Sequence, residues 1–410
     1  NLFVDNVQVQ LYTEFAQTPD RTKTRTSVVK ARYDLWKTGP KDDGQKLLDL
    51  VGDALEVGMV PEAVQMADEL LAGVAAKKVK TTPQVDRFAA AYGPIQKGLA
   101  GRTADPGDGP GWKAKLQRGY PDATELPDLH YYLVTWGGGG GDEGRRRLAQ
   151  LEQNFQAFYL SHAARGVALP LPDKQLPVIL ASTGEEFRKL AGVLNAGHPV
   201  VDGVYAPDYD VLVLSPEPVD AEVGKTFQRQ ANAFYRAGVS REMLLHPERY
   251  TVKSPNGYRL NADNNPNVKG GTSAEEAARA MTWAMADAFY QRDSELAAVS
   301  REGSRQLLFA SGLAPRFVAQ PAWLANGAAA YYHRPRGAVF TYPDDDKAVA
   351  TVGLSTGYGV PNFAQQKLFR ELAEKKELNK DTGLLLRQVV TDAYFAAAAA
   401  KAPADLDDAK

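Results

Sequence analysis

Two short runs decide the fold: Arg301-Glu302-Gly303-Ser304-Arg305-Gln306 and, shortly after, Trp323-Leu324-Ala325-Asn326-Gly327. The first run lies within residues 294–309, whose pattern predicts a helix. On that helix Arg301 and Arg305 are four residues apart and share one face, with Glu302 beside the first of them. The run therefore places two cations and one carboxylate close together.

A zinc-binding helix of the zincin type has the same frame with other residues in it. There, two histidines stand four residues apart, a glutamate beside the first is the general base, and a third ligand comes from a later helix. Here Glu302 keeps the place of the base, whereas Arg301 and Arg305 occupy the histidine positions and Asn326 the third. Because arginine stays protonated and offers no lone pair, we expect no metal, no cofactor and no catalytic residue, with Glu302 a vestige.

The residues around these positions resemble a family of bacterial proteins, the DUF1570 family, which is similar to gluzincin (peptidase MA-like) zinc metallopeptidases. A first set of matching residues surrounds the vestigial site: Gln306, Gly312, Leu313, Pro321, Trp323, Leu324, Gly327 and Tyr331. A second set, at 177–180, 185–187 and 203–214, resembles the strand, helix and hairpin that precede the site in the family. The resemblance covers residues 125–335 and implies a gluzincin-like domain there.

The resemblance also implies how the second run is packed. Trp323 and Leu324 are expected to be buried against the helix that carries Leu307 and Leu308. If that frame holds, truncation of Trp323 to alanine costs about 3–5 kcal/mol.

The composition is that of an ordinary globular protein. The 410 residues are 44% hydrophobic and 24% charged, and the net charge of −2 gives no electrostatic reason to expect nucleic acid. No apolar run approaches the ~18 residues that span a bilayer. Cysteine is absent, which excludes disulfides and thiolate chemistry. The chain begins at Asn1 without Met; a cleaved signal peptide would fit, and an extracytoplasmic location (periplasm or cell surface) is favoured.

The periodicity of the chain predicts an α+β protein. Three amphipathic helices, at 42–57, 61–76 and 83–99, indicate a helical, repeat-like domain over residues 1–100, with a break at Pro94. A Gly/Pro-rich linker at 101–112 separates it from a peptidase-like domain at 113–400, and a tail follows at 401–410.

The peptidase-like domain is predicted to contain a small sheet and several helices. Its strands are expected at 129–136 and 176–181, with a hairpin at 200–214 that turns at Pro207. Its helices are expected in these segments: 142–165, 185–194, 220–237, 273–292 and the motif helix at 294–309.

Two other features have ordinary interpretations. The five glycines at 137–141 have no Lys-Ser/Thr after them, so a surface loop is favoured over a phosphate site. His162 lies at helical spacing from Phe155 and Phe158 and is expected to be a partly buried structural histidine.

Several roles for the arginine pair stay open at this stage. The guanidinium groups could line a solvated helix face, or fill the vacated metal position beside buried acceptors, or bind a small anion together. Tyr331 and His333, which follow Asn326 by five and seven residues, are further candidates for contacts in the same cleft.

The sequence predicts a catalytically inactive, peptidase-like protein with a binding or structural role. Its partners would be other proteins, in a larger complex or a homo-oligomer, with no nucleic acid and no membrane-spanning segment. Two alternatives remain: a working zinc peptidase with unorthodox ligands, and an anion- or small-ligand-binding module that uses Arg301 and Arg305.

Overall fold

The structure, a computed structural model, describes most of the first half of the chain and parts of the second. The described residues are 25–104, 123–136, 141–194, 202–217, 251–254, 257–260, 294–315, 320–332, 340–343, 349–352 and 381–393, with the single positions 229, 232, 318, 370 and 374. The helices predicted at 220–237 and 273–292, almost all of the glycine run, most of the linker, His333 and the tail at 401–410 lie outside them.

The chain divides into two compact units. The smaller comprises 1–24, 217–296 and 336–355, and the larger the remainder. In the smaller unit the structure describes two antiparallel hairpins, β6 (Thr251–Ser254) with β7 (Gly257–Leu260) and β8 (Phe340–Pro343) with β9 (Val349–Val352). All elements discussed below belong to the larger unit.

Five helices open the larger unit. They are α2 (Arg25–Thr38), α3 (Gly44–Glu56), α4 (Val60–Ala75), α5 (Pro83–Tyr92) and α6 (Gln96–Ala100). The three predicted helices are confirmed, with the expected break around Pro94, whereas α2 was not predicted.

Local sequence explains where these helices begin and end. The side chain of Asp43 accepts a hydrogen bond from Lys46 N, and that of Thr82 from Val85 N, so both residues cap the first turn of a helix. Gly58 follows α3 with a φ of 75°, a conformation that glycine adopts without strain.

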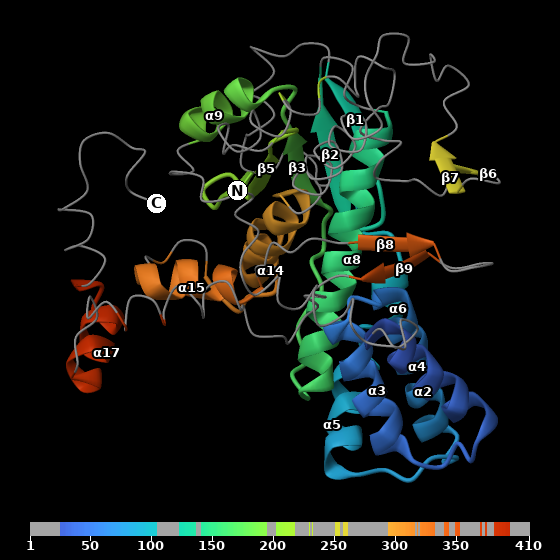
Figure 1. Cartoon of the computed structure of the whole chain (residues 1–410). Coiled ribbons are helices and arrows are strands. Elements are labelled where there is room, and N and C mark those ends of the chain that lie inside the picture. The colour runs from blue at the N-terminus through green and yellow to red at the C-terminus, as the bar shows by residue number, and fades with distance from the viewer. Residues whose placement is uncertain are drawn as a thin grey trace. The chain divides into compact units, whose positions relative to one another are not determined.

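A five-stranded mixed sheet follows helices α2 to α6 in the larger unit (Figure 1). Its strands are β1 (Thr124–Pro127), β2 (Tyr131–Thr135), β3 (Leu176–Leu180), β4 (Gly203–Ala206) and β5 (Val211–Leu214), in the order β1-β2-β3-β5-β4. The three central strands are parallel, and β1 and β4 pair antiparallel at the edges. All but β1 were predicted, including the hairpin of β4 and β5, and the α+β class is confirmed.

The central strands are buried because helices cover the sheet. Every residue of β2, β3 and β5 is buried, as expected for parallel strands with near-continuous apolar sequence. Helix α8 (Asp142–Ala164) packs on β2, and α9 (Gly184–Val193) contacts β5. Both helices were predicted.

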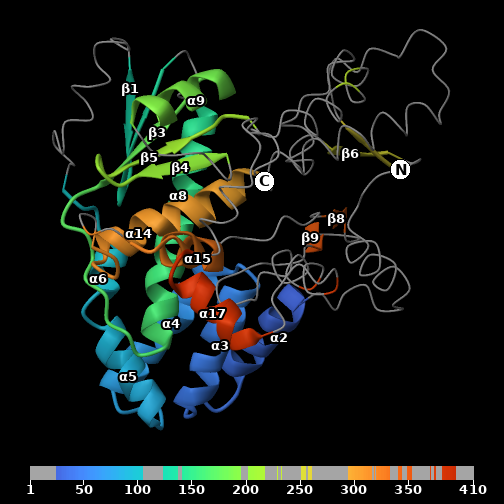
Figure 2. The same ribbon diagram turned by 90° about the vertical axis from the view of Figure 1, so that its left-hand side faces the viewer.

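The helical segment and the sheet share one core. The long helix α8 runs from the sheet down to α3, α4 and α5, as Figure 2 shows from the side. One continuous set of buried apolar side chains includes residues of all these elements. The core therefore continues across the predicted linker, while the repeat-like character of the helices and the domain limits stay predictions.

The remaining helices carry the candidate site. A π-helical turn, η1 (Val299–Gly303), leads directly into α14 (Ser304–Ala310), and α15 (Ala322–Tyr332) follows. Helix α17 (Thr382–Val390) comes last among the described elements. No helix in the described part of the chain is both long and apolar enough to cross a bilayer.

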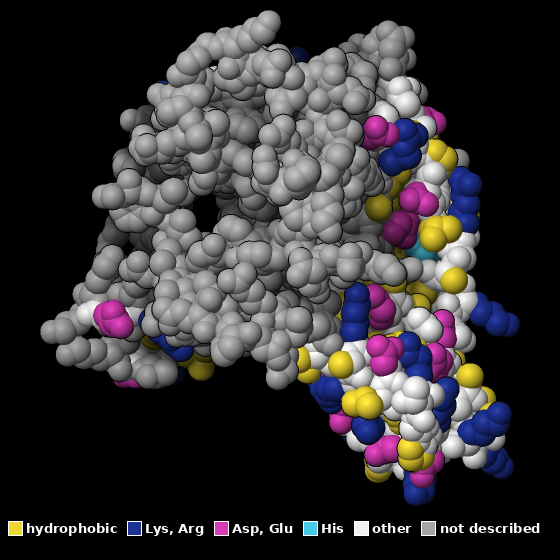
Figure 3. All heavy atoms as spheres, turned by 45° about the vertical axis from the view of Figure 1, so that its right-hand side comes forward, with side chains coloured by type: hydrophobic (Ala, Val, Ile, Leu, Met, Phe, Trp, Pro, Cys, Tyr) yellow, Lys and Arg dark blue, Asp and Glu magenta, His cyan; other side chains and the backbone are white. Residues whose placement is uncertain are grey.

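The described surface shows no concentration of one charge on the face drawn in Figure 3. Basic and acidic side chains are interspersed over the part of the molecule that holds α2 to α6. The described side chains on this face give no electrostatic reason to expect a polyanion as a partner.

Candidate functional site

The motif helix changes its geometry at Arg301 and Glu302. Residues 294–298 are α-helical, η1 forms a wider turn through Arg301 and Glu302, and α14 resumes the α-helix. Single π-helical turns inside α-helices are rare and occur frequently at functional sites. The predicted helix is thus confirmed, and its geometry changes at Arg301 and Glu302.

The carboxylate of Glu302 is fully engaged. Its Oε2 accepts a hydrogen bond from the backbone N of Tyr205, at 3.2 Å, and its Oε1 accepts one from Arg301 Nε, at 3.1 Å. Arg305 Nη1 lies 3.6 Å from Oε2. Glu302 is only 3% exposed, so these contacts replace water around both oxygens.

The two arginines are not a solvated helix face. Arg301 is 6% exposed and pairs with Glu302, so this interpretation is wrong for Arg301. The Arg305 side chain is 21% exposed and reaches the same carboxylate. The structure supports the second alternative, in which the guanidinium groups sit beside a buried carboxylate.

The edge strand β4 lies close against the motif helix. A Cβ atom added at Gly203 would lie 3.2 Å from the Cβ of Ala298, so glycine permits this approach. The backbone N of Tyr205, on the same strand, donates a hydrogen bond to Glu302. Glu302 therefore fixes η1 to the sheet and satisfies one amide of an edge strand.

Further polar side chains hold α14 in place. Ser304 and Asn154 of α8 exchange hydrogen bonds at 3.3 and 3.4 Å. Gln306 Nε2 donates to the backbone oxygens of Pro177, at 3.1 Å, and Asp210, at 3.4 Å. Both Ser304 and Gln306 are fully buried, so this side of the helix has a structural role.

One hydrogen-bond donor of Arg305, its Nε, makes no hydrogen bond within the cluster. Its Nε is buried and has no acceptor within hydrogen-bonding distance among the residues that the structure describes. Its Nη1 faces Glu302, and Arg301 faces the same carboxylate. Two guanidinium groups therefore share one negative charge.

The helix that contains Asn326, the third predicted ligand position, adjoins this cluster. Helix α15, which contains Asn326, contacts both η1 and α14. The side chain of Asn326 lies outside what the structure describes. Its convergence with Arg301 and Arg305 therefore stays a prediction.

The prediction that Trp323 and Leu324 are buried is wrong. Both are 36% exposed, although Leu307 and Leu308 are buried as expected. Helix α15 packs through Ala329, which is 1% exposed. At about 100° per residue, Trp323 and Leu324 point about 120–140° away from Ala329 around the helix axis.

Truncation of Trp323 to alanine is accordingly expected to cost about 1–2 kcal/mol, because 36% of this residue is already exposed to water. Chemical denaturation, followed by circular dichroism, measures the loss. Truncation of the fully buried Phe158 provides the matched control, at about 3–5 kcal/mol. A Trp323 variant as unstable as the Phe158 variant would contradict the observed packing of α15.

Tyr331 and Tyr332 contact the end of α8. The hydroxyl of Tyr331 accepts a hydrogen bond from Arg165 Nη2, at 2.9 Å, and this side chain is 52% exposed. The hydroxyl of Tyr332 lies 3.1 Å from His162 Nε2, and burial raises the pKa of Tyr332 to about 12. Tyr331 thus lies at the surface beside Arg165, and a contact with Arg301 or Arg305 stays a prediction.

His162 is a structural histidine, as predicted. Its Nδ1 lies 2.8 Å from the carbonyl oxygen of Phe158 and must donate, which leaves Nε2 to accept from Tyr332. Burial lowers the pKa of His162, and the nearby Arg165 also lowers it. A neutral ring suits this arrangement, which ties α15 to α8.

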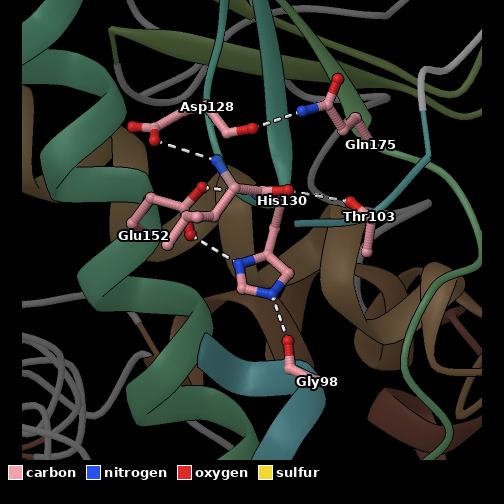
Figure 4. A network of polar contacts seen from close by, with 7 residues as sticks. Gly98, Thr103, Asp128, His130, Glu152 and Gln175 are labelled. Carbon is pink, nitrogen blue, oxygen red and sulfur yellow. Dashed lines mark hydrogen bonds and ion pairs between the residues drawn. The ribbon is translucent and has the colours of Figure 1, made fainter. Parts of the chain in front are cut away.

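A second buried polar cluster was not found from the sequence (Figure 4). The backbone N of His130 donates to Glu152 Oε1 at 2.7 Å, and His130 Nδ1 lies 2.7 Å from Oε2. On the other side of the ring, Nε2 lies 2.8 Å from the carbonyl oxygen of Gly98 in α6. The sequence does contain one indication of this cluster, because the carboxylate of Glu152 interrupts the apolar face of α8 between Leu148 and Phe155.

Backbone contacts surround this cluster. Thr103 Oγ1 donates to the carbonyl oxygen of Leu129, at 3.0 Å, and Gln175 Nε2 donates to that of Asp128. The pKa of the Asp128 carboxyl is raised by burial and by the nearby Glu152. The cluster thus joins α6, α8 and the segment that leads into β2.

The candidate sites offer few ligands to a metal. In the part of the chain that the structure describes, no group of three or more His, Asp or Glu side chains is placed so that it could hold a metal ion. The Arg301–Glu302–Arg305 cluster contains one carboxylate and two permanent cations. Comparison of the chain with protein-family models, with curated proteins and with solved structures gave no match.

Proposed function

We propose that this protein is a catalytically inactive, peptidase-like protein that serves as a binding or structural component of a larger assembly. One observation carries the proposal: both oxygens of Glu302 are engaged by Arg301, Arg305 and the amide of Tyr205. A general base must accept a proton from a bound water. Both oxygens of Glu302 are instead turned to partners within the protein.

The chemistry of the neighbouring positions supports the same proposal. In a zinc peptidase the residues at 301 and 305 would supply imidazole nitrogens, and guanidinium groups repel a cation instead. The residue at 326 is a neutral amide in place of a carboxylate. The binding or structural role is an analogy with other enzyme folds that have lost their chemistry.

The rival proposal is a zinc peptidase with unorthodox ligands. Elemental analysis of the purified protein distinguishes the two. We expect no stoichiometric zinc in the parent protein. About one zinc per chain, lost when Glu302 is replaced by glutamine, would overturn the proposal.

Restoration of the ligands tests the zincin frame itself. The triple variant Arg301→His, Arg305→His, Asn326→Glu is expected to bind about one zinc ion per chain, because it recreates two imidazoles and one carboxylate at zincin spacing. Isothermal titration with zinc, against the parent, measures the gain. Each single substitution is expected to bind little, since one or two ligands hold zinc weakly.

A fourth substitution tests whether Glu302 acts as a zinc ligand or as the general base. Glu302→Gln in the triple variant is expected to leave zinc affinity nearly unchanged, because the base of such a site is not a ligand. A folded triple variant that binds no more zinc than the parent would mean that the three positions do not converge. Native mass spectrometry of the parent then tests the assembly, as a homo-oligomer or as a complex with other proteins.

A further inference from the structure

We infer that the Arg301–Glu302–Arg305 cluster is completed by a carboxylate group of a ligand, which Arg305 binds through Nε and Nη2. This inference rests on the proposed binding role and names the ligand class for the same site. The carboxylate belongs to a free acid, to an acidic side chain or to the C-terminus of a peptide.

The first argument is the unused donor. Arg305 Nε is buried and has no acceptor among the residues that the structure describes, whereas buried donors in folded proteins are nearly always paired. The nitrogen that faces Glu302 is Nη1. The edge of the guanidinium plane formed by Nε and Nη2 is therefore the one left for a ligand.

The second argument is charge. The ion pairs of Arg301 and Arg305 both go to Glu302, so the cluster carries two positive charges and one negative. Buried charges are unfavourable unless they are paired. One monovalent anion neutralises the cluster.

The third argument is access. The Arg305 side chain is 21% exposed, whereas those of Arg301 and Glu302 are 7% and 4% exposed. Solvent reaches the Arg305 side chain but not its Nε, so a ligand binds through Nε only once it displaces what covers that nitrogen, and the Arg301–Glu302 pair lies beneath. This depth suits a single functional group rather than an extended chain.

Shape and charge together favour a carboxylate over a phosphate. A planar carboxylate matches the paired N–H groups along one guanidinium edge in a bidentate geometry. Phosphate carries more than one negative charge near neutral pH and would leave the cluster with an excess of negative charge. Lysine in place of Arg305 would keep the charge and lose the paired donors.

The test uses the full chain and follows the Nε–Hε signal of Arg305 by NMR, assigned through its loss in Arg305→Lys. Four probes are titrated at constant ionic strength: acetate, an acetylated trialanine with a free C-terminus, its C-terminal amide, and inorganic phosphate. We expect acetate and the free-acid peptide to shift the signal and the amide to leave it unchanged. Tighter binding of the peptide than of acetate would identify a peptide C-terminus as the source.

Two variants accompany the titration. Arg305→Lys is expected to weaken acetate binding, measured by calorimetry, at least about tenfold. Arg145→Lys is the control, because Arg145 pairs with a carboxylate, Asp142, at the surface. It should bind acetate as the parent does.

Three outcomes would overturn the inference: no shift with acetate, equal or tighter binding of phosphate, or equal acetate binding by Arg305→Lys and the parent. Calorimetric titration of the parent with acetate and with phosphate still decides the first two if the variant folds too poorly to assign the signal. If the acetate test fails and the parent contains no zinc, the proposed inactive role is unaffected. Zinc in the parent would remove that role whatever the acetate result.

Discussion

Replacement of Glu302 by leucine is expected to destabilise the protein by about 3–5 kcal/mol, because it removes one partner of a buried charge cluster. Arg301 would be left buried beside an apolar side chain, and the amide of Tyr205 would lose its acceptor. Urea denaturation, followed by circular dichroism, measures the change in the free energy of unfolding. A catalytic glutamate in an open cleft would give a much smaller loss, since water would replace its contacts.

Two further variants make this measurement specific. Asp34→Ala removes an exposed pair with Lys37 and is expected to change stability by no more than about 0.5 kcal/mol. The double variant Glu302→Leu, Arg301→Leu is expected to be more stable than Glu302→Leu alone, because it also removes the stranded charge. Unchanged stability of Glu302→Leu would show that the cluster does not hold η1 to β4.

The sequence predicts those elements whose own periodicity determines them. Helices α3, α4 and α8 and the buried strands β2 and β3 were predicted to within a few residues. Helix α2 was missed although its buried residues Val29, Tyr33 and Trp36 have helical spacing. Charged residues separate them and dilute the apolar pattern.

The candidate site was only partly predictable. Spacing alone placed Arg301, Glu302 and Arg305 together, and the structure brings both guanidinium groups within 4 Å of the Glu302 carboxylate. Spacing could not show that η1 widens the turn at these residues, which changes the direction of each side chain relative to a regular helix. Spacing also could not show which face of α15 packs inward, because the tertiary contacts that bury Ala329 determine that face.

The buried cluster around His130 illustrates a different limit. His130 and Glu152 are 22 residues apart in sequence, and Gly98 is 32 residues from His130. Neither pairing follows from local spacing. Only the packing of α8 against β2, together with the end of α6, brings them together.

Replacement of Glu152 by leucine is expected to cost about 3–5 kcal/mol, comparable to the loss at Glu302. The carbonyl oxygen of Gly98 can only accept, so His130 Nε2 carries a hydrogen, and the second proton lies between Nδ1 and Glu152 Oε2. Leucine at 152 leaves Nδ1 and the backbone N of His130 buried without partners. Urea denaturation measures the loss.

The double variant His130→Leu, Glu152→Leu separates this pairing from ordinary packing. Removing both polar side chains leaves fewer unpaired groups, so the double variant is expected to lose less than the sum of the two single variants. Because His130 Nε2 also holds the carbonyl oxygen of Gly98, hydrogen exchange in α6 should quicken in both variants that lack the imidazole. Additive losses, with α6 protected as in the parent, would mean that His130 merely fills space against Phe155, whose ring it stacks on at 3.9 Å.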